Sequence, residues 1–283
     1  MSSSYIELHA ASAFSFLQGA SLPEAIVDRA SDLGYSAIAL LDRDGVYGAP
    51  RFHKAATAAG IQPIVGAELT LESQKSEVRR LKSRSSHSDF RLHTSNFLLP
   101  VLCESQTGYR NLCRLITRMK LRAPKGEGAL TLDDLDGGTS GLVALVGRAA
   151  LDGRRHGVGG LLDRIVGVFG RSNVYVELQR HFRRDEERDN DTLAKLADAF
   201  HVPTLATNGV RFDVPARRPL FDVLTCIHHG TTVAAAGRRL APNAERYLKP
   251  PSEMADLFRD QDAAVARTRD PRSPRAATPP AGN

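Results

Sequence analysis

Charged and polar side chains follow several of the short apolar runs in this sequence, at the positions where a buried strand would end. Carboxylate and imidazole groups gathered there could bind metal ions, whereas arginine guanidinium groups could bind carboxylates or phosphates. Loops after strands are exposed and polar in most proteins, so spacing alone does not separate a functional site from an ordinary loop edge. The candidates are His9, Asp42, Arg43, Glu68, Asn96, Arg148, His181 and Arg211.

The elements that must position these residues alternate between apolar strand-like runs and amphipathic helices. Strands are predicted over residues 5–10, 36–42, 62–71, 97–104, 141–147, 173–179 and 202–207. Helices are predicted over residues 22–34, 49–60, 108–120, 158–170, 185–200 and 217–229. Apolar strands that alternate with helices are typical of parallel βα units. Seven such strands, with no GxGxxG or Walker loop, favour an α/β fold of the closed or nearly closed barrel type.

The composition is that of an ordinary globular protein, with 283 residues, a net charge of +6 and three cysteines. Cys103, Cys113 and Cys226 form no CxxC pair, so neither a disulfide framework nor a thiolate zinc site is indicated. The N-terminus has no secretion-signal pattern and no apolar run is long enough to cross a membrane. We therefore expect a cytoplasmic protein with no membrane partner.

Much of the positive charge is local. Residues 73–91 hold six Lys/Arg against two acids, within a predicted basic loop insertion over residues 73–95. Such a loop could make weak contact with DNA, although a solvated surface loop is the simpler interpretation. Residues 261–283 are rich in proline, arginine and small residues and are predicted to be a disordered tail.

Several collinear stretches give a specific resemblance, among them "ELHAASAFSFLQGAS", "ALLDRDGVYGAP", "VYVELQRH" and "PTLATNGVRF". From about Tyr5 to Phe258 the sequence resembles the PHP (polymerase and histidinol phosphatase) domain of the bacterial DNA polymerase III alpha subunit, most closely its error-prone branch. The resemblance implies a distorted seven-stranded β/α (TIM-like) barrel over residues 1–230. Residues 231–260 would then begin the connection toward a polymerase palm domain, which this chain does not contain.

The resemblance also implies a ligand set, because metal-binding members of the family carry His-x-His at the end of the first strand. Their sites hold Zn, Mn or Fe. In this sequence only His9 and Glu68 match ligand positions, with Asp42 as a neighbouring carboxylate that could support them. The other ligand positions correspond to Ala11, Gln18, Arg43, Asn96, Arg148, Gly209 and Arg211.

Two residual ligands cannot close the coordination of a polynuclear metal cluster. Arg43, Arg148 and Arg211 would also place permanent positive charges where divalent cations sit. We therefore expect the metal site to be degenerate, and His181, in the family's "ELQRH" stretch, to pack at the site rather than bind metal alone. Our structural hypothesis is that Arg43 or Arg211 replaces the metal as the counter-ion of Asp42, Glu68 or both. A functional variant is that the mouth arginines bind phosphate without hydrolysing it.

The family context is a DNA-directed DNA polymerase (nucleotidyltransferase) of DNA replication, DNA repair and the DNA damage response. The resemblance implies DNA and the replication or repair machinery as partners, and Mg in the absent palm. We expect no catalytic residue and no cofactor in this chain itself, which would have a structural or scaffold role. It would be inactive as a polymerase and as a phosphoesterase. A frameshifted fragment and a genuine lone domain both remain open, and the alternative function is a metal-dependent phosphoesterase using a rearranged site around His9, Asp42, Glu68 and His181.

Overall fold

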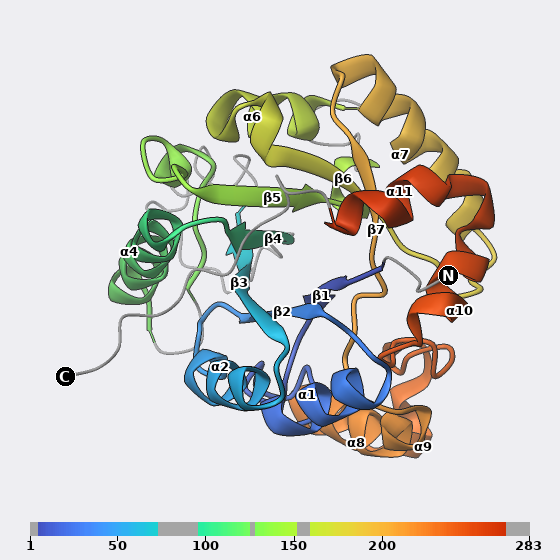
Figure 1. Cartoon of the computed structure of the whole chain (residues 1–283). Helices are drawn as coiled ribbons and strands as arrows, with labels where there is room; N and C mark the ends of the chain where they lie inside the picture. The colour runs from blue at the N-terminus through green and yellow to red at the C-terminus, as the bar shows by residue number, and fades with distance from the viewer. Residues whose placement is uncertain (1–4, 73–95, 125–127, 152–158, 270–283) are drawn as a thin grey trace.

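The computed structural model describes residues 5–72, 96–124, 128–151 and 159–269 (Figure 1). A seven-stranded sheet with the sequential order β1 to β7 curls into a barrel-like shape, with helices packed around its outside. The predicted α/β fold with seven strands is confirmed. The strands are β1 (Glu7–Ala10), β2 (Ala37–Arg43), β3 (Gln62–Leu71), β4 (Phe97–Cys103), β5 (Leu142–Val146), β6 (Val174–Leu178) and β7 (Thr204–Ala206).

The helices follow the predicted alternation closely. Both α1 and α2 have proline within their first two positions, and each is followed by a glycine with positive φ, at Gly34 (+72°) and Gly60 (+69°). Proline suits a helix start and glycine suits the left-handed residue beyond a helix end. The α-helices are α1 (Pro23–Asp32), α2 (Ala49–Ala58), α4 (Gln106–Arg122), α6 (Gly160–Phe169), α7 (Glu186–Phe200), α8 (Arg218–His228), α9 (Val233–Ala236), α10 (Pro251–Leu257) and α11 (Asp262–Ala266).

Strand β4 corrects the expectation of uniformly parallel βα units, because it runs antiparallel to both β3 and β5. Leu71, the last residue of β3, pairs with Phe97, the first residue of β4. The chain therefore re-enters the sheet at the end where it left, and adjacent strands joined at one end must be antiparallel. The apolar character of β4 gives no sign of this reversal, because a strand buried on both faces reads the same in either direction.

Side chains of the strands alternate between two apolar layers. One layer fills the inside of the curled sheet and includes Leu8, Leu41 and Tyr175, while the other packs between the sheet and the helices. The pairing of β1 with β2 shifts between Glu7 and Ala10, so that two residues, Leu8 and His9, stand opposite one residue of β2. This is the pattern of a β-bulge, which can redirect a side chain next to a functional site.

The edge between β1 and β7 is closed at the mouth, meaning the end of the barrel at which the parallel strands have their carboxyl ends. Ala10 and Val210 form a parallel bridge. The Val210 N–H donates to the His9 carbonyl (2.8 Å) and the Ala11 N–H donates to the Val210 carbonyl (2.9 Å). The segment after β7 is therefore fixed against the end of β1.

The structure corrects the predicted start of the tail at residue 261. Residues 262–266 form α11, which lies near β7 in Figure 1, and Ala264, Val265 and Thr268 are buried. The Ile6 N–H donates to Thr268 Oγ1 (3.1 Å), which ties this segment to the start of the chain. The sequence around these buried residues is rich in polar residues and proline, so composition alone does not indicate that they are folded. The rest of the predicted tail, 270–283, and the basic loop over 73–95 lie outside the described residues.

Among the residues that the structure describes, no helix combines the length and the apolar character needed to cross a membrane.

Candidate functional site

His9 lies at the centre of a buried group of charges at the barrel mouth. Its Nδ1 is 2.6 Å from Glu177 Oε1 and its Nε2 is 2.7 Å from Glu68 Oε1. His9, Glu68 and Glu177 are 5%, 1% and 5% exposed. Burial opposes a charged imidazole, but the Glu177 and Glu68 carboxylates outweigh it and raise the pKa of His9 to about 9. His9 is therefore an imidazolium at neutral pH, and both ring nitrogens donate hydrogen bonds.

Arg211 completes the group from the segment after β7. Its Nη1 donates to Glu68 Oε2 (3.0 Å) and its Nη2 donates to Glu68 Oε1 (2.5 Å), an arginine–carboxylate pair with two hydrogen bonds. Burial raises the pKa of Glu68, but Arg211 and His9 outweigh burial and hold it well below its usual range. Charges thus alternate in the order Glu177, His9, Glu68, Arg211, which we call the mouth network.

Arg43 and Asp42 do not form the pairing that our hypothesis allowed for them. Arg43 donates through Nη1 to Gln18 Oε1 (2.8 Å) and through Nε to Thr70 Oγ1 (3.2 Å). Consecutive residues of a strand point to opposite faces of a sheet, so Asp42 and Arg43 cannot meet across the mouth. Of Arg43 and Arg211, only Arg211 therefore pairs with one of the two carboxylates of the hypothesis, which is Glu68.

Asp42 instead holds the turn after β1 and the start of α2. Its Oδ1 accepts from Ser12 N–H (2.9 Å), Ser12 Oγ (2.8 Å) and Ser15 Oγ (2.9 Å), while its Oδ2 accepts from Gly48 N–H (3.1 Å). All these groups are packed around a carboxylate that is 2% exposed. The role is structural, since its acceptor sites are filled by neighbouring donors.

Removing the Asp42 carboxylate is expected to leave several buried donors without an acceptor. Asp42→Ala should lower the free energy of unfolding by about 2–3 kcal/mol, measured by urea denaturation. Asp32→Ala, at an exposed position near the end of α1, is the matched control and should change it by less than about 0.5 kcal/mol. Equal effects of the two substitutions would contradict the structural role.

Arg148 and His181 lie near the mouth network but are bonded to other groups. Arg148 Nη2 is 2.9 Å from Asp189 Oδ2 of α7. His181 Nε2 donates to the Asn208 carbonyl (2.8 Å), and its Nδ1 is 3.3 Å from Glu186 Oε1. Asn96 directly precedes β4. The four residues of the rearranged phosphoesterase site are therefore not brought to one point, because Asp42 and His181 face different partners from His9 and Glu68.

Sequence reasoning missed Glu177, although a signal for it existed. It is the one carboxylate in the otherwise apolar run of β6, VYVEL, and alternation with Tyr175 places it on the inside of the barrel. A lone acid in such a strand needs a buried partner. Arg246 was also missed, because it lies far beyond the last predicted strand along the chain and belongs to no recognisable sequence motif.

The donor set does not fit a metal ion. Both ring nitrogens of His9 are bonded to carboxylates, and both oxygens of Glu68 are bonded to Arg211. A metal ligand needs a free lone pair, which an imidazolium does not have. Within the part of the chain that the structure describes, no group of three or more His, Cys, Asp or Glu side chains could hold a metal ion. No chemical step is therefore assigned to a metal in this chain.

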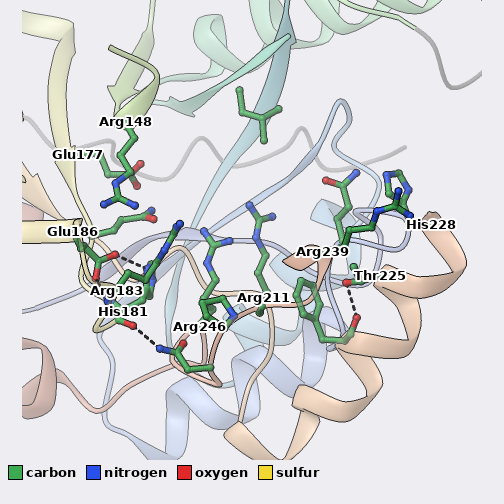
Figure 2. Close-up of a pocket in the computed structure, with 18 of the residues that line it drawn as sticks. Arg148, Glu177, His181, Arg183, Glu186, Arg211, Thr225, His228, Arg239 and Arg246 are labelled. Atoms are coloured by element: carbon green, nitrogen blue, oxygen red, sulfur yellow. Dashed lines mark hydrogen bonds and ion pairs between the residues drawn. The ribbon is translucent and has the colours of Figure 1, made fainter. Parts of the chain in front are cut away.

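The mouth network borders a pocket of about 520 Å³, shown in Figure 2. Glu177 and Arg211 line it together with residues that follow β5, β6 and β7. We call it the arginine pocket after the five arginines in its lining, which are Arg148, Arg183, Arg211, Arg239 and Arg246.

Sequence comparison finds relatives along almost the whole chain. The chain is 37% identical over 279 residues to an error-prone DNA polymerase of Anaeromyxobacter sp. (strain K), covering 94% of this chain and 22% of that protein. An error-prone DNA polymerase of Mycolicibacterium paratuberculosis is 35% identical over 270 residues, covering 92% of this chain and 24% of that protein. The chain thus spans less than a quarter of the length of these curated relatives.

Solved structures show a more distant likeness. An amidohydrolase from Chromobacterium violaceum is 16% identical, with a TM-score of 0.48 over 73% of this chain and 87% of that chain. A two-domain protein from Bacteroides vulgatus with a predicted PHP-like metal-dependent phosphoesterase is 12% identical, with a TM-score of 0.45 over 92% of this chain and 63% of that chain. The family model described as "PHP domain" matches residues 7–181, more than half of the chain. The chain therefore belongs to the PHP domain family.

Proposed function

We propose that this chain is the PHP domain of an error-prone DNA polymerase and that it has a structural rather than a catalytic role. The observation that carries the proposal is the mouth network. Arg211 occupies both oxygens of Glu68, and Glu68 and Glu177 occupy both nitrogens of His9. Two residues at the family's metal-ligand positions, His9 and Glu68, are thus engaged in ion pairs within the protein, which supports a structural role for the barrel.

The domain limits of this proposal are residues 1–230 for the PHP barrel and 231–260 for the start of a connection toward the palm. The second segment is held to the barrel, which supports its inclusion in the same folded unit. Asn208 Nδ2 donates to the carbonyls of Glu245 (2.8 Å) and Tyr247 (2.6 Å). Tyr35 Oη donates to the Lys249 carbonyl (2.7 Å).

The polymerase context further implies DNA and the replication or repair machinery as partners, and a cytoplasmic location. Contact of residues 73–91 with DNA stays a prediction, because this segment lies outside the described residues. Palm-domain carboxylates and Mg would be supplied by another part of a full-length polymerase.

A domain exchange tests the proposed function. Replacing the matching segment of the Anaeromyxobacter polymerase with this chain should preserve primer extension, because the two segments share the fold and 37% of their residues. The isolated 283-residue chain should incorporate no nucleotide on the same primed template. Incorporation by the isolated chain, or a correctly folded exchange protein without any primer extension, would overturn the proposal.

The alternative of a metal-dependent phosphoesterase has its own test. The purified chain supplied with Zn, Mn or Fe is expected to release no phosphate from p-nitrophenyl phosphate above a no-protein blank. Metal-dependent turnover that disappears in Glu68→Gln would instead establish the alternative.

A further inference from the structure

The outer face of α4 carries a row of arginines on the outside of the barrel. Arg110, Arg114, Arg118 and Arg122 follow one another at intervals of four residues, and all four are exposed. Residues four apart in a helix lie on one face, about 6 Å apart along the axis. Residues 106–122 contain no Asp or Glu, so this α4 arginine row receives no countercharge from its own helix.

The rest of the described chain supplies little negative charge to the α4 arginine row. Asp134 Oδ1 is 2.5 Å from Arg122 Nη1 and 4.0 Å from Arg118 Nη1. Among the residues that the structure describes, no ion pair involves Arg110 or Arg114. One carboxylate therefore faces four guanidinium groups, and the half of the row nearer the start of α4 has no ionic partner there.

The same face of α4 also holds a groove of about 520 Å³. Its exposed lining is mostly apolar although Arg114, Arg118 and Arg122 contribute to it, because arginine covers a surface with the carbon atoms of its stem. Leu121 lines the groove as well and is 83% exposed, the highest value for a large apolar side chain in the described part of the chain. Water thus contacts an apolar surface that positive charges surround.

The inner face of α4 holds the helix in place. Leu112, Leu115 and Met119 are buried in the core, where α4 packs on β3, β4 and β5. Ser105 caps the start of the helix, since its Oγ accepts from the Gly108 N–H (3.2 Å). Figure 1 shows α4 on the outside of the barrel, on the opposite side from α10 and α11. The arginines and the groove therefore lie on a rigid element that needs no rearrangement to meet a partner.

The combination of charge and apolar surface favours an acidic peptide that also carries apolar residues. Guanidinium groups form paired hydrogen bonds with carboxylates. An apolar side chain placed between such carboxylates would cover Leu121 and the groove, as in complexes where an amphipathic helix lies in a groove. A nucleic acid backbone would match the charge of the row, but it has no apolar side chain to place in the groove.

We propose that the outer face of α4 is a docking surface for an acidic amphipathic segment of another protein. The Asp or Glu side chains of that segment pair with Arg110, Arg114 and Arg118, and an apolar side chain packs against Leu121. The charges stay partly hydrated, so the interaction weakens as the salt concentration rises. The proposal goes beyond the structural role and rests on α4 alone, so its test is independent of the polymerase context.

Fluorescence anisotropy of a labelled model peptide tests the proposal. The peptide is a helix of the same length as α4, 17 residues, with leucine along one face and glutamate on both sides of it, and it is titrated with the whole chain. The double variant Arg110→Gln/Arg114→Gln should weaken peptide binding by about 3-fold to 30-fold, because each exposed ion pair contributes modestly. Leu121→Ser should weaken it by about 5-fold to 30-fold through loss of apolar contact.

Matched substitutions on other surfaces control for the loss of charge and of apolar area. Arg259→Gln removes a positive charge from a side chain that is 82% exposed. Phe16→Ser removes an apolar side chain that is 79% exposed, in the turn after β1. Both should leave peptide binding unchanged. Circular dichroism verifies that every variant is folded, which is expected because all the substituted side chains are exposed.

Changes in the peptide test the same contacts on the wild-type chain, whatever the folding of the variants. Replacing its glutamates with lysine should abolish binding, and replacing its leucines with serine should weaken binding by at least about 5-fold. No binding of the acidic peptide, equal binding of the serine peptide, or equal effects of the α4 variants and their controls would overturn the proposal. Duplex DNA that binds where the peptide does not, and that is weakened by Arg110→Gln/Arg114→Gln but not by Leu121→Ser, would overturn it as well.

Discussion

Glu68→Ala is expected to lower the free energy of unfolding by about 3–5 kcal/mol, the largest effect of any single substitution at the barrel mouth. Glu68 is 1% exposed and accepts hydrogen bonds from both His9 and Arg211. Its removal leaves a permanent guanidinium charge buried without its carboxylate and leaves His9 with Glu177 alone. Chemical denaturation monitored by circular dichroism measures the change.

A surface pair supplies the control for this prediction. Glu24 forms a similar two-bond pair with Arg51 (2.6 Å and 2.9 Å), but both side chains are exposed. Glu24→Ala should therefore cost less than about 1 kcal/mol. The double variant Glu68→Gln with Arg211→Met should be less destabilised than the sum of its single variants, because neither charge is then left alone. Additive effects, or a Glu68→Ala cost as small as that of Glu24→Ala, would show that the buried pair is not the main support of the site.

The stability of the domain is expected to be greatest near the ordinary glutamate pKa, at about pH 4.5–5, and to fall on both sides. The folded-state pKa of His9 is raised from 6.5 to about 9, so its contribution is complete below pH 6.5 and is lost as the pH rises through 9. Burial raises the pKa of Glu7 from 4.5 to about 7, which makes stability fall from pH 4.5 through 7. The pKa values of Glu68 and Glu177 are lowered, so their contributions are lost as the pH falls below the usual glutamate range.

Substitution of His9 tests whether this residue causes the loss of stability at alkaline pH. Thermal unfolding measured between pH 5 and pH 10 should show a decreasing melting temperature in the wild-type chain. In His9→Gln the part of the decrease between about pH 6.5 and 9 that is due to His9 should be absent, while the part due to Glu7 remains. His53→Gln, on α2 outside the mouth network, is the matched control and should retain the wild-type profile. An unchanged alkaline decrease in His9→Gln would show that His9 is not an imidazolium in the folded protein.

Much of the fold could be predicted because the apolar periodicity is strong and local. The predicted helices over 22–34 and 185–200 correspond to α1 and α7, and each predicted strand has a counterpart. The direction of β4 could not be predicted, because it depends on the end of the sheet at which the chain re-enters after β3, and the residues of β4 itself do not encode this. The buried residues of α11 were hidden by the proline- and arginine-rich composition around them.

At the site, sequence could predict which residues gather but not which of them bond. The candidates His9, Glu68 and Arg211 meet, since His9 and Glu68 lie toward the carboxyl ends of β1 and β3 and Arg211 follows β7 at the same barrel mouth. Arg43 was an equally good partner by residue type, and only its place on β2 sends it to Gln18 and Thr70. Arg246 belongs to a segment that reaches the mouth through tertiary contacts, which no local pattern encodes.

The most direct test of the central claim, that ion pairing has replaced metal at the barrel mouth, is the metal content of the purified chain. The chain should be equilibrated separately with Zn, Mn and Fe, freed of unbound metal by gel filtration, and measured by elemental analysis. The account predicts far less than one metal ion per chain for all three elements, because both nitrogens of His9 and both oxygens of Glu68 are already engaged in ion pairs. Near-stoichiometric metal in the wild-type chain, lost in Glu68→Gln, would contradict it.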